Sequence, residues 1–127
     1  MTMRRSILAA LVAALLIVSP VLGRAGASIT APDGLSFGDT FSVTFTPPNH
    51  YSGALRARGE CRANDTSIGV NVLWIQYAST EGTTAGPFTL GPTPSWAGGG
   101  ADCIVALVSI DNNRYHLFAE DDFVVAP

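Results

Sequence analysis

Beyond residue 28, apolar and polar residues alternate along most of the chain, and this period of two constrains the fold more than any other feature. In residues 41–46, phenylalanine and valine alternate with serine and threonine. Pro47 and Pro48 then end the run, because proline cannot continue a ladder of backbone hydrogen bonds. No stretch has a helical period long enough to predict a helix. We therefore predict an all-β fold.

Turn residues divide this part of the chain into about seven short strands. Asp111-Asn112-Asn113 indicates a hairpin turn, because Asn and Asp tolerate the left-handed backbone that such turns require. Seven short strands in about a hundred residues are typical of a two-sheet sandwich. The expected strands cover residues 29–31, 41–46, 54–63, 70–78, 87–90, 101–110 and 115–119, and 123–126 continue the last one after a bulge or kink at residues 120–122.

The amino-terminal residues have the order of a secretory signal peptide. Arg4 and Arg5 precede an apolar run over residues 7–18, and small residues follow it. This run is too short for a membrane helix, which needs roughly twenty residues. We predict a signal peptide over residues 1–27 and a single secreted domain over residues 28–127, with no membrane attachment after cleavage. An uncleaved amino-terminal anchor is the alternative.

Cleavage there would leave a distinctly acidic protein. Three of the seven basic residues lie in the predicted signal peptide, so four arginines remain against ten acids, a net charge of about −6. The chain contains no lysine. Because nucleic-acid phosphates require a basic surface, this charge argues against a nucleic-acid partner.

Two cysteines, Cys61 and Cys103, remain after cleavage. An exported chain meets an oxidising environment in which such pairs usually close, so we predict a disulfide between them. The bond would close a loop of 42 residues and contribute about 4 kcal/mol in the chain-entropy model. The alternative, a thiol pair for metal or redox chemistry, lacks a CxxC spacing.

The surroundings of the two cysteines carry a family resemblance. The first lies in GECRAN at the end of a strand, and the second ends the glycine-rich stretch SWAGGGADC. These motifs resemble the immunoglobulin-like superfamily and, more narrowly, small exported bacterial immunoglobulin-like proteins. The resemblance spans about residues 28–127 and implies an immunoglobulin-like two-sheet sandwich with an exported role and no assigned chemistry.

The chain departs from the antibody pattern in the position of its disulfide. Antibody-type domains join their second and sixth strands, which lie in different sheets. Here Cys61 falls on the third expected strand and Cys103 on the sixth, so the bond would join neighbouring strands of one sheet. Trp96 is expected to lie against this disulfide.

Three arginines suggest a first candidate contact surface. Arg56, Arg58 and Arg62 occupy alternate positions of one strand, and arginine binds carboxylates and phosphates well. A solvated face with a purely structural role is the favoured interpretation, since charged residues also protect sheets from edge-to-edge pairing. Partner binding is the alternative.

The strand over residues 70–78 suggests a second candidate contact surface, because its apolar residues fall on both sides of the strand. Leu73, Ile75 and Tyr77 point to one side and Trp74 to the other. Only one side of a strand in a sandwich faces the core, so the other needs a loop, a partner or a ligand as cover. A loop is favoured; otherwise these four residues are the preferred contact surface. Trp96, before Gly98, either closes the end of the fold or stacks on a sugar ring.

Chemistry has little support in the sequence. His50 and His116 stand in no metal-ligand motif, and no nucleophile elbow or phosphate-binding loop is present. We therefore expect no catalytic residue, metal or cofactor, and predict a secreted, extracellular, non-enzymatic binding module with a protein or cell-surface partner. A small-molecule carrier with Trp74, Tyr77 or Trp96 lining an apolar cleft is the alternative, and a small exported hydrolase is less favoured. The oligomeric state stays open.

Overall fold

The computed structural model describes residues 26–63, 71–111 and 113–127, and these form an all-β fold as predicted. Nearly all of the predicted signal peptide, residues 1–25, lies outside them, as does Asn112 in the predicted turn. No helix in these ranges is long and apolar enough to cross a membrane. The strands are β2 (Ser28–Thr30), β3 (Leu35–Ser36), β4 (Thr40–Thr46), β5 (Arg56–Arg62), β6 (Val72–Glu81), β7 (Thr84–Thr89), β8 (Ala101–Asp111) and β9 (Arg114–Ala126).

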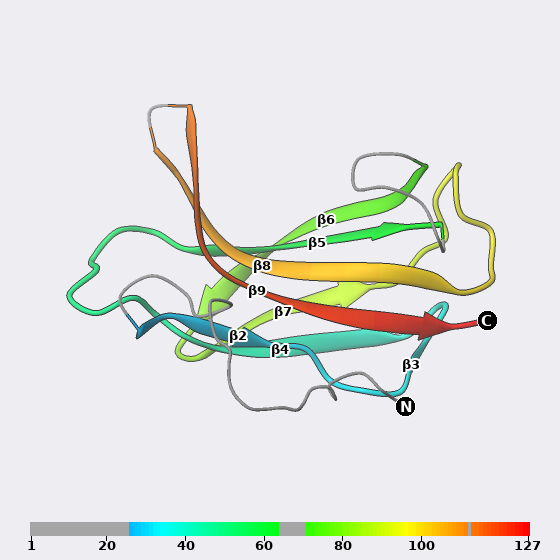
Figure 1. Ribbon diagram of the computed structural model, residues 1–127, viewed down its shortest axis with the longest axis horizontal. Helices are drawn as coiled ribbons and strands as arrows, with labels where there is room; N and C mark the ends of the chain where they lie inside the picture. The colour runs from blue at the N-terminus through cyan, green and yellow to red at the C-terminus, as the bar shows by residue number, and fades with distance from the viewer. Residues whose placement is uncertain (1–25, 64–70, 112) are drawn as a thin grey trace, which may run out of the picture.

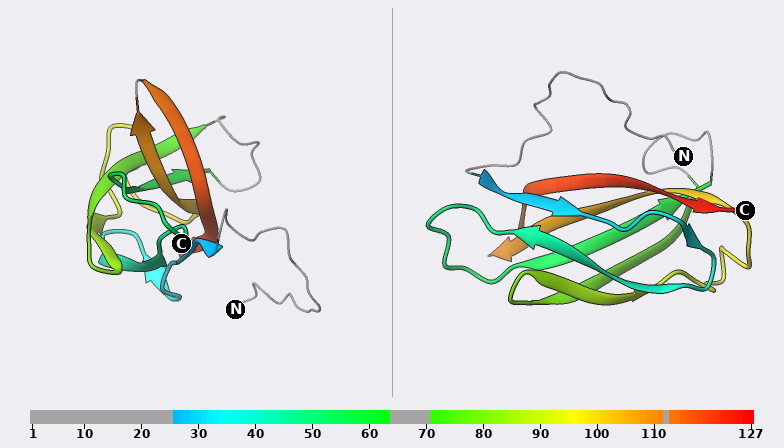
Figure 2. Two further views of the ribbon diagram at one scale, coloured as in Figure 1. Left: turned by 90° about the vertical axis from the view of Figure 1, so that its left-hand side faces the viewer. Right: turned by 90° about the horizontal axis from the view of Figure 1, so that it is seen from below.

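The strands form a single sheet in the order β2-β4-β7-β6-β5-β8-β9-β3 (Figure 1). All neighbours are antiparallel except β3 and β9, which are parallel, so the sheet is mixed. The end-on view shows that the sheet curls strongly and encloses the core as a half-barrel (Figure 2).

The predicted immunoglobulin-like two-sheet sandwich is therefore wrong. Strand β6 is ten residues long. It joins the part of the sheet that contains β5 to the part that contains β7. It pairs with β5 from Val72 to Ser79 and with β7 through Thr80 and Glu81, so hydrogen bonding continues around the bend. Two separate sheets would need a break at this point.

The core fills the concave side of the curled sheet. Strand β4 illustrates why, since its alternate residues Phe41, Val43 and Phe45 are buried and those between them are exposed. Phe41 stacks on Phe88 with 5.2 Å between ring centroids and meets the edge of Phe123 at 5.6 Å. Side chains from β4 and β9, which lie near opposite ends of the strand order, thus meet inside the curl. Burial of these large rings stabilises the fold.

The amino-terminal segment connects the two edges of the sheet. Strand β2 pairs with β4 at one edge, whereas β3, five residues further on, pairs with β9 at the other. Between them, the backbone N–H of Ala31 donates a hydrogen bond to the Asp121 carboxylate at 2.9 Å. Strand β3 was not predicted from the sequence, because two residues are too few to show a period.

The long β8–β9 hairpin is confirmed, and its end rises away from the rest of the sheet (Figure 1). Asn113 has the left-handed backbone (φ 63°) that the predicted turn requires. The expected irregularity at residues 120–122 is absent, because β9 runs through them. The register shifts instead at Phe118, since Val108 pairs with Leu117 and Leu107 with Ala119.

Candidate contact surface

The predicted disulfide between Cys61 and Cys103 is confirmed. The two residues are direct partners in the antiparallel pair β5 and β8, with 4.1 Å between their Cα atoms. The bond therefore links adjacent strands of one sheet, as their positions in the sequence predict. Both side chains are buried on the concave side, so the disulfide belongs to the core.

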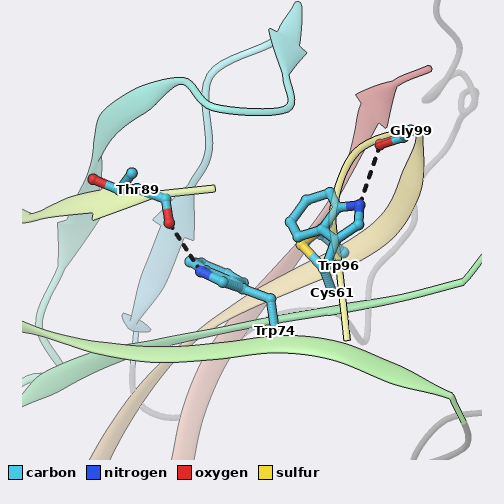
Figure 3. The surroundings of a disulfide bond; sticks show 6 residues. Cys61, Trp74, Thr89, Trp96 and Gly99 are labelled. Atoms are coloured by element: carbon cyan, nitrogen blue, oxygen red, sulfur yellow. Dashed lines mark hydrogen bonds between the residues drawn. A yellow bond between two sulfur atoms is a disulfide. The ribbon is translucent and has the colours of Figure 1, made fainter. Parts of the chain in front are cut away.

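Both tryptophans also lie in the core (Figure 3). Trp96 is beside the disulfide and packs edge-on against Phe37, and its indole N–H donates to the Gly99 carbonyl at 3.3 Å. Trp74 donates its indole N–H to the Thr89 carbonyl at 2.9 Å. Trp96 is 2% exposed and Trp74 is 5% exposed, so both side chains pack in the core.

Two other residues of the predicted aromatic strand, Ile75 and Tyr77, lie on the convex side of the sheet. Ile75 is 48% exposed and Tyr77 is 42% exposed. Leu73 is half-buried against the core, and the Thr93 hydroxyl donates to its carbonyl at 2.6 Å. The favoured loop cover is therefore wrong for Ile75 and Tyr77, which are open to solvent, and the Thr93 contact reaches only the backbone carbonyl of Leu73.

The arginines lie on the same side of the sheet as these apolar residues. Arg58 pairs with Tyr77 of β6 on one side and with Ala106 of β8 on the other, and Ala106 pairs with Glu120 of β9. The two candidate surfaces are therefore one continuous surface. We call the side of β5, β6, β8 and β9 that carries this row the outer face. Arg56 is exposed on it, and Arg62 is partly buried.

Arg58 is held in place at the centre of the outer face. Its guanidinium Nη1 donates to Glu60 Oε1 at 2.9 Å, and its Cζ lies 5.9 Å from the centre of the Tyr77 ring. Burial lowers the pKa of Arg58, but the hydrogen bonds and charges of Glu60 and Tyr77 outweigh this, so the pKa lies above its ordinary value. A fixed cation beside an aromatic ring is a feature of many contact surfaces.

Tyr115 of β9 completes this central group. Burial raises the pKa of its phenol; the nearby Arg58 charge lowers it, and Tyr77, Glu120 and Glu60 raise it. The charges that act on the phenol belong to Arg58 and Glu60 of β5, to Tyr77 of β6 and to Glu120 of β9 itself. Half of the Tyr115 side chain is still exposed.

Large exposed apolar residues gather on the same face. In the described residues, all six lie on the outer sides of β6, β8 and β9, at Ile75, Tyr77, Ile110, Tyr115, Leu117 and Val124. Only the first two of these residues were predicted from the sequence as part of a contact surface. The alternation of Tyr115 and Leu117 was visible, but the register shift at Phe118 moves them to the side that carries Glu120, and no sequence pattern marked that shift.

No group of three or more His, Cys, Asp or Glu side chains within the described ranges is arranged to hold a metal ion. Comparisons of the chain with protein-family models, curated proteins and solved structures find no match. The structure defines the protein as an all-β chain with one curled mixed sheet and one disulfide.

Proposed function

We propose that the protein is an exported, non-enzymatic interaction module that binds a protein or cell-surface partner through its outer face. The observation that carries the proposal is that all six large exposed apolar side chains of the described residues lie on this face. Scattered apolar residues are normal on a surface, but a gathered set with a charged border indicates a contact site. The disulfide is consistent with an oxidising, extracytoplasmic location.

The position of the tryptophans favours this function over the small-molecule carrier. The carrier hypothesis required Trp74, Tyr77 or Trp96 to line a cleft, but Trp74 and Trp96 are packed in the core against Phe88 and Phe37. Tyr77 lies on the open outer face. A contact with a macromolecule uses such a surface directly, whereas a carrier encloses most of its ligand.

Capture of partners from the cell surface and medium of the producing cell tests the proposal. We expect Tyr77→Ala to weaken capture by about tenfold or more, because aromatic residues at the centre of a contact dominate binding. The triple change of Arg56, Arg58 and Arg62 to Ala should also weaken capture, since these arginines lie on the same face as Tyr77.

Thr44→Ala is the matched control, since Thr44 is exposed on β4, away from the outer face. Trp74→Ala, which the sequence alone would favour as a test, is unsuitable because it removes a core residue. Capture that is equal for the wild type, Tyr77→Ala and the triple arginine variant would contradict the proposal.

A further inference from the structure

Two residues of the predicted signal peptide belong to the folded domain. The structure describes Gly26 and Ala27, and Ala27 is only 4% exposed. Its side chain is part of the hydrophobic core, together with those of Ile29 and Ala31. These three buried residues alternate with exposed ones, so the buried side of the β2 segment begins at Ala27, one residue before the strand. A cut after Ala27 would remove this residue from the core.

Gly26 has a conformation and a contact that depend on the folded domain. Its φ is 84°, in the left-handed region that favours glycine. The side chain of Asn49, from the loop after β4, lies against it, and a Cβ atom at Gly26 would be 3.2 Å from both terminal atoms of that side chain. The chain thus enters β2 through a glycine that packs against a loop distant in the sequence.

Loss of these two residues would weaken the start of β2. The strand has only three residues, and Ser28 pairs with Thr46 of β4. If Ser28 were the first residue of the chain, it would lie at a terminus, where strands fray. The space that the Ala27 side chain fills in the core would also be left open, which is destabilising. The fold is therefore more stable in a mature chain that keeps Gly26 and Ala27.

We infer that the signal peptide is cut before Gly26, so that Gly26 and Ala27 remain in the mature protein. The inference rests on the export that forms part of the proposed function. Cleavage of a signal peptide requires small residues in an A-x-A-like pattern before the cut bond. Gly23 and Ala25 provide this pattern for a cut after Ala25, and Val21 and Gly23 provide a weaker one for a cut after Gly23. Both bonds follow the predicted apolar run.

The mass of the exported protein, collected from the medium and the cell envelope, tests the inference. We expect mature chains that begin at Arg24 or at Gly26, and none that begins at Ser28. Gly23→Leu should abolish both expected starts, because it places a large residue directly before one bond and at the third position before the other. A cut after Ala27 would tolerate this change, since Gly23 lies outside the last three residues before that bond.

Ala27→Gly is a second and independent test, since glycine keeps the small-residue pattern and removes only a buried methyl group. If Ala27 is in the mature protein, the exported variant should have a Tm about 4–8 °C below that of the wild type. If the cut follows Ala27, the substituted residue is removed and the exported variant is identical to the wild type. Ser28→Gly is the matched control, because the Ser28 side chain is exposed and the Tm should fall by less.

A mature chain that begins at Ser28 would overturn the inference, as would an exported Ala27→Gly protein with the Tm of the wild type. The proposed function would stand in either case, because the protein would still be exported. Recovery of the uncleaved chain alone would overturn the inference and contradict the proposed export as well. Failure of the proposed contact surface has a different result, which is equal capture by the wild type and Tyr77→Ala whatever the first residue of the mature chain.

Discussion

Gly59 occupies a position where a neighbouring ring leaves no space for a side chain. It lies on the concave side of β5, where the Trp74 ring covers it. A Cβ atom at this position would lie 2.7 Å from two atoms of that ring and 3.4 Å from Phe88. Glycine weakens a strand in general, but here its missing side chain makes room for one of the two indole rings of the core.

We expect Gly59→Ala to lower the free energy of unfolding by about 1–3 kcal/mol, because the added methyl group overpacks the core. Urea unfolding measures this. Gly82→Ala is the control, since a Cβ there meets nothing within 4 Å and only its positive φ opposes the change. Trp74→Phe in the Gly59→Ala background should cost less than Trp74→Phe alone, because the smaller ring leaves space. A fully stable Gly59→Ala protein would contradict the packing argument.

Tyr115 makes the stability of the folded protein depend on pH in the alkaline range. Burial raises the pKa of its phenol above the ordinary value of 10.0. Above pH 10 the unfolded chain therefore loses this proton while the folded chain keeps it, and stability falls as the pH rises through the folded-state pKa. We expect Tyr115→Phe to reduce this fall, measured as the urea midpoint between about pH 9 and 11. Equal pH dependence of the variant and the wild type would refute the assignment.

At the scale of elements, the sequence predicted the strands better than the surfaces they form. The alternation in β4 and β5 and the turn before β9 were clear, because each depends on local side-chain chemistry. The composition of the outer face depends on Phe118, where one extra residue reverses which side chains of β9 point outward. The acidic run at residues 120–122 looked like the better candidate for an irregularity, since charges often interrupt strands. Its actual role is to supply Asp121 to Ala31 and Glu120 to the outer face.

We expect Asp121→Ala to release the amino-terminal segment from β9. The Asp121 carboxylate accepts the Ala31 N–H at 2.9 Å, and hydrogen bonds to charged groups contribute about 1.5–3 kcal/mol. The variant should therefore lose stability in this range and show faster hydrogen exchange at Ala31. Asp122→Ala is the matched control, because Asp122 is exposed on the opposite side of the same strand. Unchanged exchange at Ala31 in Asp121→Ala would show that this bond does not hold the segment.

At the scale of the whole molecule, the sequence could not distinguish a sandwich from a curled sheet. Both need about seven short strands with one buried side, and they share the same alternation. The difference is decided by the last residues of β6, which pair with β7 only because β6 is long enough to continue around the bend. Pairing of this kind is set by the three-dimensional path of the chain. The disulfide, in contrast, was predictable, because the two cysteines of a chain with a predicted signal peptide have a single way to pair.

That disulfide links β5 and β8, which are neighbours in the sheet but are separated in the chain by β6 and β7. It closes a loop of 42 residues, so its loss should lower stability by about 4 kcal/mol. Small domains have only about 5–15 kcal/mol in total, so the reduced protein should be close to unfolding. We expect reductant to shift the urea midpoint of the wild type strongly and to leave a Cys61→Ala/Cys103→Ala protein unaffected. That variant should itself unfold at a low urea concentration. A reduced wild type as stable as the oxidised form would mean that the sheet holds β5 and β8 together without the bond. The disulfide would then give no reason to expect that folding depends on an oxidising environment.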